Sequence, residues 1–281
     1  MKIFDTVEQV KAEVSGILLR HEEIGFVPTM GALHRGHIDL IKRALKENDS
    51  VFCSIFVNPM QFNNPDDLRS YPRTFEKDLQ MLEESGCQYL FKPSVEEIYP
   101  WKPAEKYDFG PLESVMEGKY RPGHFNGVAI VVKRLFDIIT PHRSYFGEKD
   151  LQQLAIIRAL VRQDRLKVDI VPCSTVREAD GLAMSSRNTL LTPDQRKRAG
   201  IIYQLLLWCK NNFANKSIQE LKKYVEGQIS SQTDMCLDYF EIVEPDTLIP
   251  IAQKKQRDAA YGCIAVKVGA IRLIDNMFFQ S

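Results

Sequence analysis

The sequence predicts an α/β fold in which a parallel-sheet domain is followed by a smaller α+β domain. Short apolar runs alternate with amphipathic helical patterns through about the first 170 residues, which is typical of a parallel sheet with crossover helices. After about residue 172, two helical patterns are followed by two alternating apolar runs. We therefore expect one domain over residues 1–174 and a second over residues 175–281, with a short hinge and a ligand cleft between them.

The individual elements follow from periodicity and capping signals. The first domain is expected to have strands at 24–28, 50–56, 88–92, 143–146 and 167–171, and helices at about 6–20, 36–47, 74–85, 125–139 and 149–162. In the second domain, helices are expected at 192–211 and from 217, and apolar alternating runs lie at 236–243 and 260–268. Capping-box spacing is found for Thr6 with Gln9 and for Ser94 with Glu97. Ligands bind beyond the carboxyl ends of parallel strands, so motifs that follow strands are the first candidates for a site.

Composition limits the protein class. The 281 residues include 37 Lys plus Arg and 37 Asp plus Glu, so the formal net charge is zero and no basic excess indicates a nucleic-acid partner. No signal-peptide pattern and no uninterrupted run of about 18 apolar residues occurs. We expect a soluble, cytoplasmic protein with no membrane partner. The six cysteines have no CxxC spacing and are expected to be reduced.

The segment PTMGALHRGH, residues 28–37, carries the strongest chemical signal. It lies where an apolar strand turns into an amphipathic helix, and a helix start carries unpaired backbone N–H groups that favour anions. His34 and His37 are three residues apart and therefore face the same way, while Gly36 allows a ligand to approach the backbone. We interpret the segment as a phosphate site. The alternative is that one histidine caps the helix and the other packs against the sheet.

Two other segments offer groups for a triphosphate. Lys149, in FGEKDLQQ, follows a strand and opens a helix, where its ammonium can neutralise phosphate oxygens; the alternative is a solvated first turn that matches the helix dipole. In TVREADGLAMSSRN, residues 175–188, the hydroxyls of Ser185 and Ser186 and the guanidinium of Arg187 can form a mobile clamp. The alternative there is an ordinary interdomain loop.

Amide side chains indicate a polar acceptor substrate. Asn58 and Gln61 follow the second strand and Gln153 lies one turn after Lys149, so all three can orient a small hydroxy acid or amide. As an alternative, Asn58 and Gln61 are turn formers. The segment RPGHFNG at 121–127 can grip a carboxylate, or it is a helix start in which His124 is satisfied locally.

Several common sites are excluded by spacing. The pair His34 and His37 has no third ligand nearby, so no protein-bound metal is expected. Neither GxxxxGK[ST] nor GxGxxG occurs, so a nucleotide would bind through the histidine motif.

Taken together, these motifs resemble the pantothenate synthetase family, the pantoate–β-alanine ligases of the HxGH nucleotidyltransferase superfamily. The matching blocks are VPTMGALHRGH, SIFVNPMQF, YPRT, RPGHFNGV, YFGEKDLQQL, TVREADGLAMSSRN and RLIDN, in order over nearly the whole length. The resemblance implies a Rossmann-like N-terminal domain, a smaller lid-like C-terminal domain that closes over ATP, and a homodimer. Arg35 in the middle of HxGH, and Pro172, Cys173 and Ser174 before TVREADG, depart from the usual family residues.

The resemblance also implies roles for residues. His34 and His37 would contact the ATP phosphates, with His37 as the proton donor, and Lys149 would complete the catalytic set. Gln61 and Gln153 would hold pantoate, with Gln61 also near β-alanine. The implied ATP-binding residues are Met30, Gly31, Ala32, Leu33, His34, Arg35, Gly36, His37, Gly147, Glu148, Lys149, Asp150, Val176, Met184, Ser185, Ser186 and Arg187.

The implied reaction is a ligation that forms an amide bond. Pantoate would be activated by ATP as an acyl adenylate with release of pyrophosphate, and β-alanine would displace AMP to give pantothenate, a step of coenzyme A biosynthesis. Magnesium should accompany ATP, without an evident protein cage.

Three alternatives compete with this interpretation. Another HxGH adenylyltransferase would need cations for an acceptor phosphate where this chain has Asn58, Gln61 and Gln153. A class I aminoacyl-tRNA synthetase would need a tRNA-binding appendage. A catalytically inactive nucleotide-binding protein has no need to keep His34, His37, Lys149 and Ser185 together.

Overall fold

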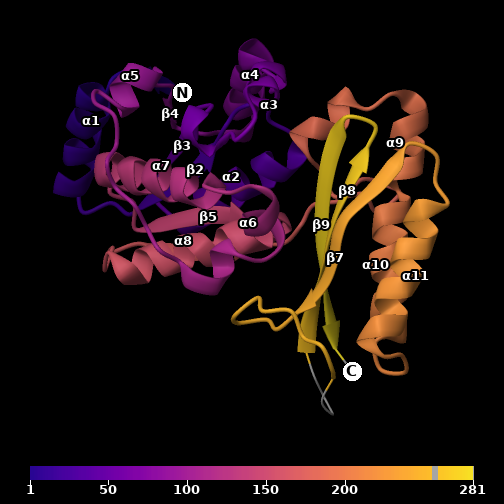
Figure 1. Ribbon diagram of the computed structural model, residues 1–281. Coiled ribbons are helices and arrows are strands. Elements are labelled where there is room, and N and C mark those ends of the chain that lie inside the picture. The colour runs from indigo at the N-terminus through magenta and orange to yellow at the C-terminus, as the bar shows by residue number, and fades with distance from the viewer. Residues whose placement is uncertain (255–258, 281) are drawn as a thin grey trace. The chain divides into compact units, whose positions relative to one another are not determined.

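The computed structural model describes residues 1–254 and 259–280, which fold into two compact units (Figure 1). The first unit comprises Met1–Phe109, Arg121–Glu148 and Gln153–Ser174. The second comprises Gly110–Tyr120, Lys149–Gln152 and Thr175–Ser281. Two short segments that precede residue 174 therefore pack with the second unit, and one of them carries Lys149.

The first unit is built on a six-stranded parallel sheet, which confirms the predicted α/β class (Figure 1). Its strand order is β1-β4-β3-β2-β5-β6. The strands are β1 (Lys2–Phe4), β2 (Ile24–Thr29), β3 (Ser50–Ile55), β4 (Tyr89–Phe91), β5 (Arg143–Gly147) and β6 (Asp169–Cys173). Only β1 was not predicted, because three residues are too short to show an alternating pattern.

Helices cover both faces of this sheet. Alternate residues of β2 point to opposite faces: Val27 joins a buried cluster with Leu40 and Ile41 of α2, whereas the ring of Phe26 contacts Phe136 of α7. The helices of this unit are α1 (Val7–Leu19), α2 (Arg35–Glu47), α3 (Pro65–Ser70), α4 (Phe75–Ser85), α5 (Val95–Ile98), α7 (His124–Ile139) and most of α8 (Leu151–Gln163).

The two predicted capping boxes have different outcomes. Thr6 and Gln9 form the reciprocal pair of bonds at the start of α1, as predicted. Ser94 caps α5 by accepting from the Glu97 N–H, but the Glu97 carboxylate accepts from the N–H of Val7 at 2.6 Å instead of returning the bond. The second prediction was therefore half wrong. Ser94 caps the helix, but the Glu97 side chain bonds to Val7, which is distant in sequence, and does not complete the box.

The strand order places a switch point between β2 and β5. From β2 the chain proceeds to β3 on one side, and from β5 it proceeds to β6 on the other. Thr29 pairs with Ile55, and Gly147 with Cys173, so the strands end along one edge of the sheet. Ligands of open α/β sheets bind at such a point.

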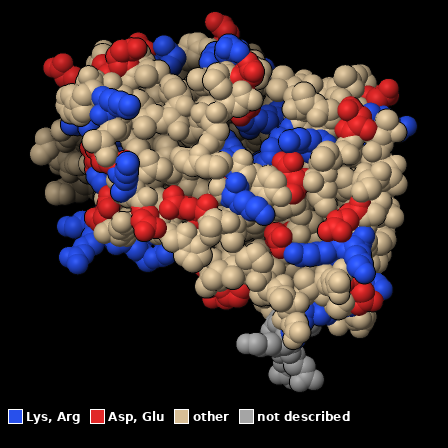
Figure 2. Space-filling model, in the orientation of Figure 1, with Lys and Arg blue, Asp and Glu red and all other residues tan. Residues whose placement is uncertain are grey.

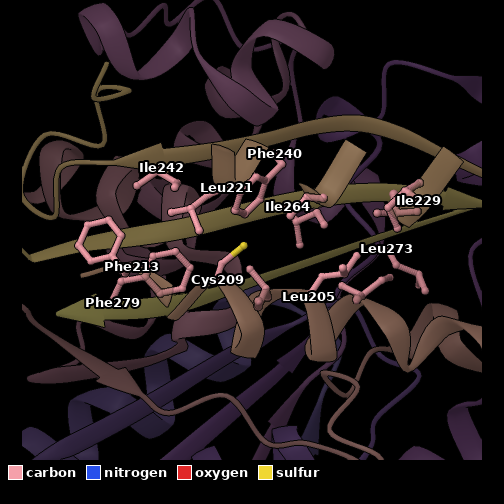
Figure 3. Close-up of a cluster of buried hydrophobic side chains, with 14 of the residues drawn as sticks. Leu205, Cys209, Phe213, Leu221, Ile229, Phe240, Ile242, Ile264, Leu273 and Phe279 are labelled. Atoms are coloured by element: carbon pink, nitrogen blue, oxygen red, sulfur yellow. The ribbon is translucent and has the colours of Figure 1, made fainter. Parts of the chain in front are cut away.

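The second unit contains an antiparallel sheet, β7 (Met235–Val243), β8 (Ala259–Val268) and β9 (Ile271–Gln280). Helices α10 (Ile201–Asn212) and α11 (Ile218–Ser230) pack on it. Figure 3 shows Cys209 of α10, and Phe213 directly after that helix, beside Phe279 of β9. The strand β9 was missed because Arg272, Asp275 and Asn276 interrupt its apolar alternation. The predicted helix 192–211 is two helices, α9 (Pro193–Ala199) and α10, interrupted at Gly200.

The remaining elements are short. Helix α6 (Met116–Tyr120) and the single-turn helices η1 (Pro59–Gln61), η2 (Gly110–Glu113), η3 (Glu148–Asp150) and η4 (Ser186–Leu190) connect the larger elements. On the face shown in Figure 2, acidic and basic side chains are interspersed. Within residues 1–254 and 259–280, no helix has the length and apolar character needed to cross a bilayer.

Candidate active site

His34 and His37 form a reciprocal capping box at the start of α2. The Nδ1 atom of His34 accepts a hydrogen bond from the N–H of Gly36 at 3.1 Å, and Nδ1 of His37 accepts from the N–H of His34 at 3.3 Å. The two ring centroids are 4.1 Å apart. The alternative that a histidine caps the helix is therefore part of the structure, and both rings take part.

This capping arrangement determines which ring nitrogen can donate. In a neutral imidazole one nitrogen accepts and the other carries the proton. Because Nδ1 accepts a backbone bond in His34 and in His37, the neutral rings carry their protons on Nε2. Each neutral ring can therefore donate from Nε2 while its Nδ1 caps the start of α2.

The loop between β2 and α2 uses its amides internally. The N–H of Gly31 donates to the Thr29 hydroxyl, and the N–H groups of Ala32 and Leu33 donate to the two carboxylate oxygens of Asp78, each at 2.8 Å. We expected backbone N–H groups at this helix start to bind the anion. In this loop, which precedes the helix start at Arg35, the amides of Ala32 and Leu33 bind a buried carboxylate and that of Gly31 binds a hydroxyl. The expectation for the helix start itself stays a prediction.

Asp78 supports a loop with unfavourable backbone angles. Gly31 and Ala32 have φ values of 78° and 49°, and the second is uncommon for a residue with a Cβ. Asp78 is 1% exposed and also accepts from the Thr74 hydroxyl at 3.0 Å. The sequence offered a signal that we did not use: Asp78 is spaced with Phe75, Leu79 and Leu82 on the apolar face of α4, where a charge is unusual.

The amide of Gln61 is held in one orientation. Nδ2 of Asn58 donates to Oε1 of Gln61 at 3.1 Å, so Nε2 of Gln61 is the donor end, and it lies 3.0 Å from Sδ of Met30. Oδ1 of Asn58 accepts from the Tyr99 hydroxyl at 2.9 Å, and burial raises the pKa of that phenol, which keeps it a neutral donor. The structure therefore brings Gln61 next to the loop that leads to His34. Tyr99 was missed because it lies 41 residues from Asn58.

The motif at 121–127 braces this turn. His124 is buried, and its Nδ1 lies 2.7 Å from the backbone oxygen of Gln61, while its Nε2 lies 3.1 Å from the Arg121 guanidinium. The structure shows a helix start at His124, as one of the two readings expected, but one partner of the ring is 63 residues away in sequence. Binding of a carboxylate by this motif stays a prediction. Nδ2 of Asn58 also donates to the backbone oxygen of Gly127 at 3.0 Å.

Gly127 provides a test of this packing. A Cβ at this position would lie 2.2 Å from the backbone oxygen of Met60, which cannot move without displacing Gln61. We expect Gly127→Ala to lower the free energy of unfolding by about 1–3 kcal/mol and to raise the Michaelis constant of the acid substrate. Chemical denaturation and steady-state kinetics measure the two effects. Gly227→Ala is the control, since a Cβ there meets nothing within 4 Å; equal behaviour of the two variants would contradict the packing argument.

The other predicted residues lie in two segments. Gly147 ends β5, and Glu148, Lys149 and Asp150 form η3, with Nζ of Lys149 at 3.5 Å from the Asp150 carboxylate. Gln153 is half-buried on α8. The second segment is the loop from Thr175 to Arg187.

That loop is ordered by its own hydrogen bonds. Arg177 and Ala183 form a β-bridge, and the N–H of Met184 donates to the backbone oxygen of Val176 at 2.9 Å. Ser185 caps η4 by accepting from the N–H of Arg187. The loop thus brings Val176 together with Met184–Arg187, and it is a structured hairpin. No group of three or more metal-ligating side chains occurs among the residues that the structure describes.

Comparison with known proteins decides the family. The family model described as "Pantoate-beta-alanine ligase" matches residues 2–278. The chain belongs to the pantoate–β-alanine ligase family. Membership confirms the resemblance and the ligase activity, which joins pantoate to β-alanine.

Individual relatives match this chain over nearly its whole length. The "Pantothenate synthetase" of Azobacteroides pseudotrichonymphae genomovar. CFP2 is 50% identical over 280 residues, 99% of this chain and 100% of the relative. The crystal structure of the Thermus thermophilus pantothenate synthetase has a TM-score of 0.91 at 43% identity, with 99% of each chain covered. A Francisella tularensis pantoate-beta-alanine ligase, described as complexed with beta-gamma ATP and beta-alanine, has a TM-score of 0.83 at 38% identity and covers 99% of this chain and 97% of its own.

Proposed function

We propose that this ligase makes pantothenate in two steps through a pantoyl adenylate, with His34 and His37 as the donors to the ATP phosphates. In the first step a carboxylate oxygen of pantoate attacks the α-phosphorus of ATP, and the bond to the bridging oxygen breaks with release of pyrophosphate. In the second step the β-alanine amine attacks the acyl carbon and AMP leaves. The observation that carries the proposal is the adjacent pair of imidazoles at the switch point of the sheet, each of which accepts a backbone hydrogen bond at Nδ1.

The residue roles follow from charge and hydrogen bonding. Negative charge grows on phosphate oxygens in the transition state, and fixed donors stabilise it with little reorganisation. His37 donates a hydrogen bond from Nε2 to a phosphate oxygen as this charge develops, while Lys149 and the Met184–Arg187 segment bind the triphosphate. Further contacts to ATP are proposed for Met30–Arg35, Gly36, Gly147, Glu148, Asp150 and Val176. Because the amides of Gly31, Ala32 and Leu33 are used internally, their contacts to ATP would come from other atoms.

Magnesium would be bound mainly by the ATP phosphates. Mg²⁺ usually keeps several waters and is bound through substrate phosphates with one or two protein ligands. Its chemistry would be to neutralise phosphate charge. We also propose that the protein forms a homodimer and is located in the cytoplasm. Family membership supports the dimer, and the use of ATP supports the location.

Exchange of labelled pyrophosphate into ATP tests the first step. With pantoate and ATP but no amine, we expect exchange, because adenylate formation is reversible before β-alanine arrives. Other hydroxy acids serve as controls. Exchange that requires β-alanine, or that fails with every acid, would contradict the adenylate.

Gln61 is proposed to hold pantoate through its Nε2 donor, with Gln153 as a second contact. Gln61→Met keeps the side-chain length and removes the amide, so the Michaelis constant for pantoate should rise about tenfold to a hundredfold, the value of a hydrogen bond to a charged group. The constant for ATP should stay within about twofold of the wild-type value. Initial rates at varied pantoate measure the effect. Gln80→Met, which removes an exposed amide on α4, is the matched control; a change in the ATP constant alone would contradict the assignment.

A further inference from the structure

The motif RLIDN, residues 272–276, lies on β9 and has no role in the proposed chemistry. Alternate residues of a strand point to opposite faces. Leu273 joins the core formed with α10, and Asp275 shares its face. Arg272 and Asn276 therefore lie on the other face of the sheet. Each face makes polar contacts to a segment that carries proposed ATP ligands.

Asn276 contacts the lysine segment directly. Its Nδ2 donates to the backbone oxygen of Lys149 at 2.9 Å, across 127 residues of sequence. Asn276 is 6% exposed, so this bond is made largely away from water. A buried bond to the backbone of Lys149 restricts the turn from which the lysine side chain projects.

Arg272 secures the same segment from its other end. Its guanidinium donates to both oxygens of the Glu117 carboxylate at 2.7 and 2.8 Å, and the Tyr239 hydroxyl donates to the same carboxylate at 2.9 Å. The N–H of Glu117 donates to Oε1 of Gln152 at 2.9 Å. Gln152 is three residues after Lys149, so the segment 149–152 is bound to β9 directly at Lys149 and through Glu117 at Gln152.

Asp275 binds the other ATP segment. Its carboxylate accepts two bonds from the Arg177 guanidinium, at 2.6 and 3.0 Å, and that guanidinium also donates to the backbone oxygens of Gly181 and Asn276. Burial raises the pKa of the Asp275 carboxyl, while the charges of Arg177 and Lys149 oppose this shift. Asp275 thus fixes the loop that continues to Ser185.

We propose that Asn276 is a positioning residue for Lys149, and that the RLIDN strand holds the lysine turn and the Ser185 loop in register with each other. The inference rests on the proposed role of Lys149 in ATP binding. The ammonium of Lys149 lies at the end of a four-carbon stem, 3.5 Å from the Asp150 carboxylate, so its position depends on that of the backbone turn. Fixing a flexible group when a ligand binds costs affinity. Because the turn is already anchored on β9, ATP would have less conformational freedom of Lys149 to restrict when it binds.

Asn276→Ala removes the bond and leaves the strand. We expect the Michaelis constant for ATP to rise about fivefold to tenfold, the value of one buried hydrogen bond, while the constant for pantoate stays unchanged. Pyrophosphate exchange at varied ATP and pantoate measures both. Asn212→Ala is the matched control, because Asn212 also donates from Nδ2 to a backbone oxygen, that of Trp208 at 2.9 Å, in the same unit but away from either ATP segment. Asn276→Ser replaces the alanine variant if that variant does not fold.

A double-mutant cycle with Lys149→Met separates positioning from a general structural role. If Asn276 acts through Lys149, Asn276→Ala adds no further rise in the ATP constant once the ammonium is absent. Additive effects, or an effect equal to that of Asn212→Ala, would overturn the inference and leave the role of Lys149 intact. An ATP constant unchanged by Lys149→Met alone would overturn the proposed role of Lys149 itself, and the inference with it.

Discussion

Replacement of His37 by alanine is expected to lower kcat for adenylate formation about 10²- to 10³-fold, the loss that follows removal of one transition-state donor. The neutral ring donates from Nε2 because its Nδ1 accepts from the N–H of His34. The same substitution removes that capping acceptor, which costs up to about 1 kcal/mol of stability. Pyrophosphate exchange at saturating ATP and pantoate measures the loss of rate, and a thermal melt measures the loss of stability.

His37→Gln separates the two roles. Glutamine at the third position of a helix is a normal partner in a capping box, so this variant keeps an acceptor for the His34 N–H but has no imidazole. We expect the melting temperature of His37→Gln to match that of the wild type and its kcat to fall nearly as far as in His37→Ala. If glutamine restored the rate, an imidazole would not be required at this position, and the proposed role of His37 in the transition state would be overturned.

The sequence allowed the sheet to be predicted because buried parallel strands are nearly continuous apolar runs. Ile24–Thr29 and Ser50–Ile55 are such runs, and both strands were expected. The third strand of the second unit escaped prediction because of its long-range polar contacts. Its polar residues Arg272, Asp275 and Asn276 form ion pairs and hydrogen bonds to segments far away in the chain, and no local pattern contains those partners.

The candidate site shows the same division between local and long-range information. His34 and His37 were predicted to face the same way from their spacing alone, and their rings are adjacent. The spacing also led us to expect unpaired N–H groups at the helix start, and it gave no sign of the bonds made by the loop before it. Asp78, on another helix, binds the amides of Ala32 and Leu33 in that loop. A carboxylate 45 residues beyond the loop that it binds could have been noticed only from its position on the apolar face of α4.

Asp78→Asn is expected to damage both stability and rate. Asparagine offers one acceptor oxygen to the two amides of Ala32 and Leu33, so one buried N–H faces an NH₂ group instead. Loss of a charge-assisted bond with a donor left unsatisfied costs about 3 kcal/mol. The loop then loses the contacts that hold Ala32 at a φ of 49°, and a displacement of about 1 Å at His34 and His37 lowers kcat about 10²-fold. Denaturant unfolding and pyrophosphate exchange measure the two losses, with Glu76→Gln, an exposed carboxylate of the same helix, as the control.

A second substitution shows whether Asp78 acts through the backbone of the loop. Glycine adopts positive φ without the penalty of a Cβ, so Ala32→Gly should recover part of the stability and rate lost in Asp78→Asn, although it changes no hydrogen bond. In the wild-type background the same substitution should have little effect on kcat, because Asp78 already holds the loop. If Asp78→Asn lowered stability but left kcat unchanged, the carboxylate would support only the packing of α4. Recovery by glycine would instead show that a buried charge maintains the loop conformation from which both histidines project.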